Sequence, residues 1–139
     1  ALQFAGNAGG TAPGRKPGGT KAPNTLVQFN WTEDIPLLAR AMLLADKTLF
    51  VVGPPDLMDE EETFAKLTEG DEEVQKIIAE QDAALNGSQG GIIWAVDSDT
   101  GKRLSKLNID SLPVWDGMAA AEEKLFLSTT DGKVICFGE

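Results

Sequence analysis

The stretch GGIIWAVDSDTGKRLSKLNI, residues 90–109, decides the fold class of this chain. It holds two runs, 92–97 and 102–109, of which the first is largely apolar, and each run is short enough for a strand. Asp, Ser, Thr and Gly separate the runs at 98–101, and these residue types favour tight turns. The stretch therefore predicts a β-hairpin.

Related segments recur elsewhere in the chain. AMLLADKTLFVVG (41–53) aligns with GMAAAEEKLFLST (117–129) at an offset of 76 residues, and GIIWAV (91–96) aligns with GKVICF (132–137) at an offset of 41. The offsets differ by 35 residues, so we expect an insertion in the first copy. Without it the repeat falls within the ~40 to 45 residues typical of a four-stranded propeller blade.

The repeat predicts the strand order. In the two copies we expect strands at residues 38–44, 48–52, 92–97, 102–109, 114–120, 124–128 and 133–137. LVQFNW (26–31) resembles 104–109 and is expected to form an outer strand before the first copy. The prediction is a mainly β chain: two four-stranded antiparallel propeller-type blades, part of a larger β-propeller, with one acidic helical insertion. The blades, together with this insertion, would occupy residues 26–139.

Two blades are too few to close a ring, and their outer faces would be left uncovered. We therefore expect the remaining blades of a longer chain, or other subunits, as partners. No run approaches the ~18 apolar residues that span a bilayer, so no membrane span is expected.

The insertion, residues 54–89, is expected to be helical. Residues 56–82 hold eleven acids and two bases. One stripe of a helix would carry most of five residues, Val74, Ile77, Ile78, Gln81 and Leu85. Asp71, Glu72 and Glu73 would lie in the first turn, where negative charge suits the helix dipole, and Asn86-Gly87 would end the helix. A shorter helix is expected at 59–67. We expect this helical insertion to be a solvent-exposed structural segment. The alternative is a docking surface for a basic protein partner.

The composition limits the possible functions. The chain has 139 residues, 42% hydrophobic and 24% charged, which suits one soluble domain. It has no histidine and one cysteine, Cys136, so histidine bases, histidine metal sites and disulfide frameworks lack their parts. The net charge of −10 argues against nucleic-acid binding. Residues 1–25, rich in Gly and Pro, are expected to be a linker.

The motif residues carry a family resemblance. They are Gly91, Trp94, Ala95, Asp97, Thr100 and Gly101, followed in the second copy by Asp131 and Gly132. Residues 37–139 resemble PQQ-like propellers of the quinoprotein alcohol dehydrogenase-like superfamily, whose blades read like G-x-[LIV]-[WY]-A-[LV]-D-x-x-T-G-x-x-x-W. Ser105 replaces the final tryptophan of that pattern, and one cysteine cannot supply the vicinal cysteine pair of the quinone enzymes. The resemblance implies a periplasmic or extracellular location and leaves quinone chemistry unsupported.

Individual residues lead to narrower expectations. The residues 97–101 resemble the start of a calcium-binding EF-hand loop, but Asn108 stands where that loop needs a glutamate. We therefore expect a structural turn, in which Asp97 and Thr100 bond turn amides and Gly101 adopts a positive φ. Trp94 and Cys136 are expected in the core.

Trp115 follows Pro113-Val114 at a blade entrance and is a candidate ligand contact, together with the acidic Asp71, Glu72 and Glu73 as partner contacts. No catalytic, cofactor-binding or metal-binding residue is assigned. We expect a noncatalytic scaffold or protein-binding module. The alternatives are part of a quinoprotein-like oxidoreductase with its active site on other blades, and a surface module for glycans or small ligands.

Overall fold

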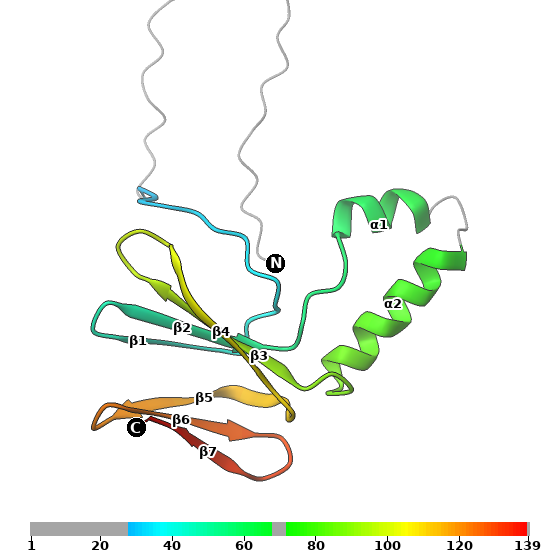
Figure 1. Cartoon of the computed structure of the whole chain (residues 1–139). Coiled ribbons are helices and arrows are strands. Elements are labelled where there is room, and N and C mark those ends of the chain that lie inside the picture. Colours follow the sequence, from blue (N-terminus) through cyan, green and yellow to red (C-terminus); the bar gives the residue numbers. More distant parts are fainter. Residues whose placement is uncertain (1–27, 68–71, 139) are drawn as a thin grey trace, which may run out of the picture.

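The computed structural model describes residues 28–67 and 72–138, which form two antiparallel sheets and two helices (Figure 1). Sheet I contains, in chain order, β1 (Ala41–Ala45), β2 (Thr48–Gly53), β3 (Gly91–Asp97) and β4 (Arg103–Ile109). Sheet II contains β5 (Pro113–Ala121), β6 (Lys124–Thr129) and β7 (Val134–Phe137). The helices α1 (Glu60–Leu67) and α2 (Glu72–Leu85) lie between β2 and β3, inside the segment 54–89.

Three strand predictions need correction. Sheet II has three strands among the described residues, so the second four-stranded sheet is not formed there. Residues 28–31, the described part of the expected outer strand 26–31, are not in a strand, because Trp31 packs on the β3–β4 turn instead. β1 begins at Ala41 rather than at residue 38. The expected linker 1–25 lies outside the described residues.

The repeated hairpins occupy equivalent positions. β2 spans 48–53 and β6 spans 124–129, which is the repeat offset of 76. Both hairpins have two-residue turns, since Ala45 pairs with Thr48 and Ala121 with Lys124. Glu122 and Glu123 have φ values of 51° and 61°, the left-handed geometry of a type I′ turn.

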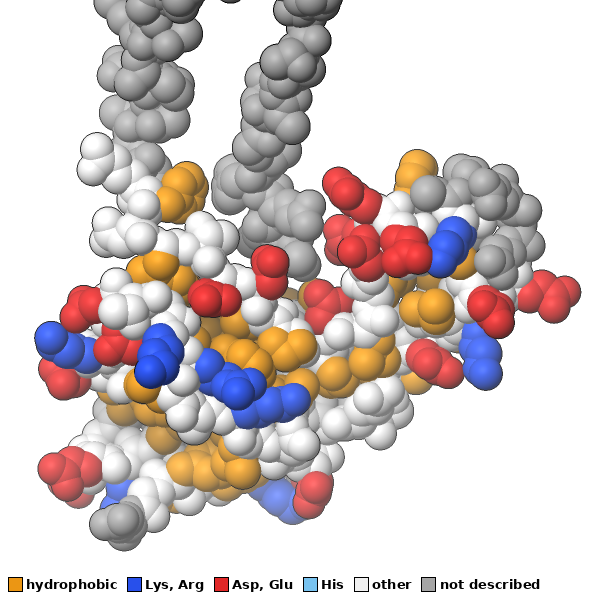
Figure 2. Space-filling view, turned by 45° about the horizontal axis from the view of Figure 1, so that its top comes forward, with side chains coloured by type: hydrophobic (Ala, Val, Ile, Leu, Met, Phe, Trp, Pro, Cys, Tyr) orange, Lys and Arg blue, Asp and Glu red, His pale blue; other side chains and the backbone are white. Residues whose placement is uncertain are grey.

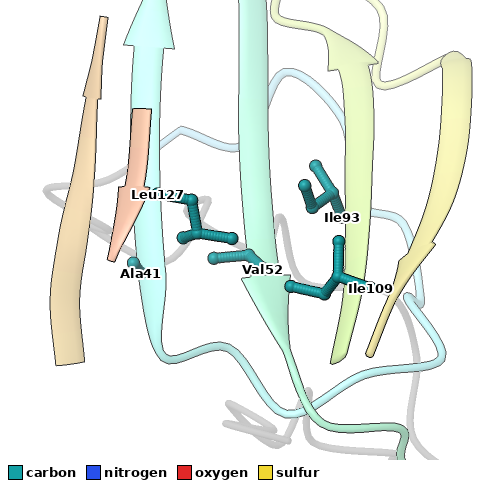
Figure 3. Packing of buried hydrophobic residues seen from close by; sticks show 5 residues of the cluster. All are labelled: Ala41, Val52, Ile93, Ile109 and Leu127. Carbon is teal, nitrogen blue, oxygen red and sulfur yellow. The ribbon is translucent and has the colours of Figure 1, made fainter. Parts of the chain in front are cut away.

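The main core lies between the two sheets (Figure 3). It is built from Ala41, Val52, Ile93 and Ile109 of sheet I and Leu127 of sheet II. Leu127 and Val52 are fully buried. Phe50, Met118 and Phe137 pack around this cluster. Burial of one such large side chain contributes about 1.5 to 3 kcal/mol, so this cluster helps to hold sheet II on sheet I.

The helices form a lateral arm beside the sheets (Figure 1). Asp59 caps α1 by accepting a hydrogen bond from the amide of Glu62 at 3.0 Å. α2 ends as expected at Asn86-Gly87, where Gly87 has a φ of 97° and the amide of Ser88 donates to the carbonyl of Ala83.

Gln81 anchors α2 to the segment that leaves β2. Its side chain is buried, accepts a hydrogen bond from the Leu57 amide at 2.7 Å and donates one to the Pro55 carbonyl at 3.1 Å. Ile77 and Leu85, expected on the same buried stripe, are partly exposed. The contact of α2 with the rest of the chain is therefore narrower than the predicted stripe, and it is partly polar.

Candidate functional site

The β3–β4 turn has the expected motif geometry. Oδ1 of Asp97 accepts hydrogen bonds from the amides of Asp99 and Thr100 at 3.1 and 2.8 Å and from the Thr100 hydroxyl at 2.8 Å. These bonds, above all the one from the Thr100 hydroxyl, hold the pKa of Asp97 below its ordinary value. Gly101 has a φ of 73°, the conformation that was expected. Asp97 thus bonds its own turn rather than projecting towards a ligand.

Trp31 completes this turn through a contact that the repeat pattern does not predict. Its indole Nε1 donates to the carbonyl of Ser98 at 2.8 Å. A Cβ on Gly101 would lie 2.6 Å from Cε3 of the same indole. The absence of a side chain at Gly101 therefore serves both the backbone conformation and the close approach of Trp31.

A second carboxylate network closes the β6–β7 turn. Asp131 accepts hydrogen bonds from Lys133 Nζ at 2.6 Å, from the Thr129 hydroxyl at 2.5 Å and from the Ser111 hydroxyl at 3.0 Å. Chiefly through Lys133, these bonds lower the pKa of Asp131 far below its ordinary value, and Asp131 in turn raises the pKa of Lys133. Gly132 beside it has a φ of 80°. This motif pair is also engaged in turn structure.

Trp115 lies at a junction that we call the Arg40 corner, formed by Arg40, Leu85, Pro113, Trp115 and Asp116. The guanidinium of Arg40 donates to the carbonyl of Leu85 at 2.7 Å and to that of Pro113 at 3.3 Å. It also sits 5.3 Å from the ring centroid of Trp115, within cation–π range. The amide of Asp116 donates to the Arg40 carbonyl at 3.1 Å. One arginine thus links β1, β5 and the end of α2.

Trp115 is 70% exposed, so the expected ligand candidate is open to solvent. Asp116 beside it has a φ of 53°, an uncommon conformation for a residue other than glycine. The register between β5 and β6 shifts between Pro113 and Met118, so Trp115 and Asp116 lie in an irregular stretch of β5. Sequence reasoning missed this corner because its central residue, Arg40, belongs to no repeat motif.

The remaining candidates are dispersed. Trp94 is half-buried on the face of sheet I that points away from sheet II, and Arg103 and Lys106 lie 5.3 and 5.9 Å from its ring centroid. Glu72 and Glu73 are exposed in the first turn of α2, and Asp71 lies outside the described residues. Figure 2 shows Asp and Glu side chains gathered over the two helices. The candidate partner contacts and Trp115 therefore do not form one site.

Cys136 is exposed, so the expectation of a buried core residue is wrong. It pairs with Phe126 across the β6–β7 ladder, and the two residues share the face of sheet II that alternates with the buried Leu127. That face points away from sheet I. Position 95 in the first copy is equivalent to Cys136, and Ala95 is buried.

The same reversal occurs at the position of Ile93. We call the face of each sheet that carries Val52, Ile93 or their equivalents the front face, and the opposite one the back face. In sheet I the front face contacts sheet II, and Ile93 is 5% exposed. In sheet II the front face is open, and the equivalent of Ile93, Val134, is 68% exposed.

The back faces of the two sheets also have different neighbours. Met118 of sheet II packs against the shared core, whereas its equivalent in sheet I, Met42, is 64% exposed. Leu127 belongs to that core, whereas its equivalent Val51 is buried in a second cluster, with Leu37 and Ile92, on the outer side of sheet I. The front face of sheet I therefore packs against the back face of sheet II, so the two sheets stack front to back.

No protein family, curated protein or solved structure matches the chain.

Within residues 28–67 and 72–138, no three Asp, Glu or Cys side chains are grouped as a metal ion requires. In the same residues, neither helix has the length and apolar character needed to cross a membrane.

Proposed function

We propose that the chain forms two consecutive blades of a β-propeller and serves as a noncatalytic scaffold or protein-binding segment of that ring. The observation that carries this proposal is the front-to-back stacking of the two repeat copies. A contact between unlike faces leaves one complementary face free on each side of the pair. Repeated with a fixed rotation, such contacts close into a ring.

The free faces have the composition that further blades would cover. Met42 and Leu44 are exposed on the back of sheet I, and Val134 and Cys136 on the front of sheet II. Uncovered apolar faces of this kind favour association with another sheet. We propose that the remaining blades, from a longer chain or from other subunits, bury them.

The scaffold role is supported by what the motif carboxylates do. Asp97 and Asp131, the two carboxylates with lowered pKa values, are occupied by hydrogen bonds within their own turns. The protein-binding role would use the helical arm. Its exposed acids, Glu60, Glu61 and Glu72 among them, suit a basic protein partner.

Thiol labelling of Cys136 tests the blade assignment. In the 139-residue chain alone, Cys136 is expected to react with a water-soluble maleimide at the rate of an exposed thiol. In the assembled native protein, a neighbouring blade should slow this reaction by about tenfold or more, with the labelled peptide quantified by mass spectrometry. A Val134→Glu change should abolish that protection, because it places a charge in the proposed interface. Equal labelling in the two settings would refute the proposal.

A further inference from the structure

A cavity opens between the two sheets at the end where their first hairpins turn. We call it the inter-sheet cleft; it has a volume of about 550 Å³, within the usual range of small-molecule sites. Its walls come from the front face of sheet I and the back face of sheet II. Phe50, Leu125 and Phe137 supply large apolar walls, and Ala45, Ala120 and Ala121 supply small ones.

The repeat explains why the cleft is open. Stacked sheets lie about 10 Å apart, and side chains from both faces must fill that gap. Position 44 in the first copy is leucine, whereas the equivalent position in the second copy, on the face that meets sheet I, is Ala120. Further from the turns, Met118 and Leu127 fill the gap. The cleft is therefore a missing layer of the core at one end.

The mouth of the cleft carries charge. Glu122 and Glu123, the two residues of the β5–β6 turn, line it together with Lys124. No hydrogen bond or ion pair within residues 28–67 and 72–138 engages either glutamate side chain. Two carboxylates against one ammonium leave the mouth negative.

From these walls and this mouth we propose that the inter-sheet cleft binds a small organic ammonium cation with an apolar body. Aromatic walls attract quaternary and alkylated ammonium groups through the negative faces of their rings, and Phe50 and Phe137 provide such rings. Glu122 and Glu123 supply the opposite charge at the entrance. This inference rests on the packing of the two sheets and is independent of any ring assembly.

The test uses the 139-residue chain and benzyltrimethylammonium as the probe. Benzyl alcohol is the neutral control and benzenesulfonate the anionic one. Calorimetry should give saturable binding of the cation, about tenfold tighter than that of benzyl alcohol, and none of the sulfonate. Amide NMR shifts should centre on the β1–β2 and β5–β6 hairpins. Equal affinity for the sulfonate, no saturable binding of the cation, or shifts centred on Trp94 or Trp115 would overturn the proposal.

Variants separate the cleft from general charge. Ala120→Leu restores the residue of the first copy, fills the cavity and should abolish binding. Glu122→Asn with Glu123→Gly removes both carboxylates while suiting the positive φ of the turn, so affinity should fall about tenfold without loss of fold. Glu60→Gln with Glu61→Gln on α1 makes the same charge change outside the cleft and should leave affinity unchanged. Unchanged affinity in the double turn variant would overturn the proposal, even if Ala120→Leu lowers stability.

Discussion

Sheets I and II carry the same repeat, yet the front face of sheet I and the back face of sheet II are the faces that meet. Ile93 and Val134 occupy equivalent positions, and one lies in the core while the other is open to solvent. Their strands form in both copies because the local pattern of apolar residues and turns is the same. Burial depends instead on which neighbour each sheet has. Strand positions therefore follow from the repeat, whereas burial follows from the stacking order.

Truncation at the two equivalent positions should give the largest contrast. Ile93→Ala removes a side chain from the core between the sheets and should lower the free energy of unfolding by about 2 to 5 kcal/mol. Val134→Ala, at an exposed position, should change it by less than about 0.5 kcal/mol. Urea denaturation followed by circular dichroism measures both values. Similar costs at the two positions would mean that the sheets do not stack front to back.

The two motif glycines should differ by a smaller amount. Gly101→Val combines a disfavoured positive φ with a collision against Trp31, so a loss of about 3 kcal/mol is expected. Gly132→Val has the same backbone conformation with no neighbour within 4 Å, so about 1 to 2 kcal/mol is expected. Thermal unfolding compares the two. A melting temperature of Gly101→Val equal to that of the parent would remove the proposed contact with Trp31.

Acid should produce the smallest effect, and both turns should contribute to it. The pKa values of Asp97 and Asp131 are lowered in the folded protein from the ordinary value of 3.8. Their stabilising contribution is therefore complete above that value and is lost as the pH falls through the lowered folded pKa values. Asp97→Asn and Asp131→Asn should each flatten the dependence of unfolding free energy on pH below about 4. Denaturation series at several pH values would reveal an unchanged slope if the turn bonds contribute nothing.

Much of the fold could be predicted from the sequence, because period-two apolar patterns and turn residues act locally. The two hairpins, the helical segment, the stop at Asn86-Gly87 and the geometry of Gly101 all depend on neighbouring residues. Long-range contacts could not be predicted in this way. Trp31 was expected in a strand and instead closes a turn 67 residues further along the chain.

The candidate site followed the same division. The repeat pattern located the turn residues Asp97 and Asp131, but not the Arg40 corner, whose bonds join β1, β5 and α2. Cys136 was expected to be buried because its strand is apolar. A strand pattern indicates which residues share a face, yet it does not reveal whether another sheet covers that face.

The front-to-back contact can be tested most directly by methyl and aromatic NOE measurements on the isotopically labelled chain. We predict NOEs from the methyl groups of Leu127 to Ala41 and Val52, and none from the ring of Phe126 to sheet I. NOEs that join Phe126 or Val134 to Ile93 would place the two front faces against each other and contradict front-to-back stacking.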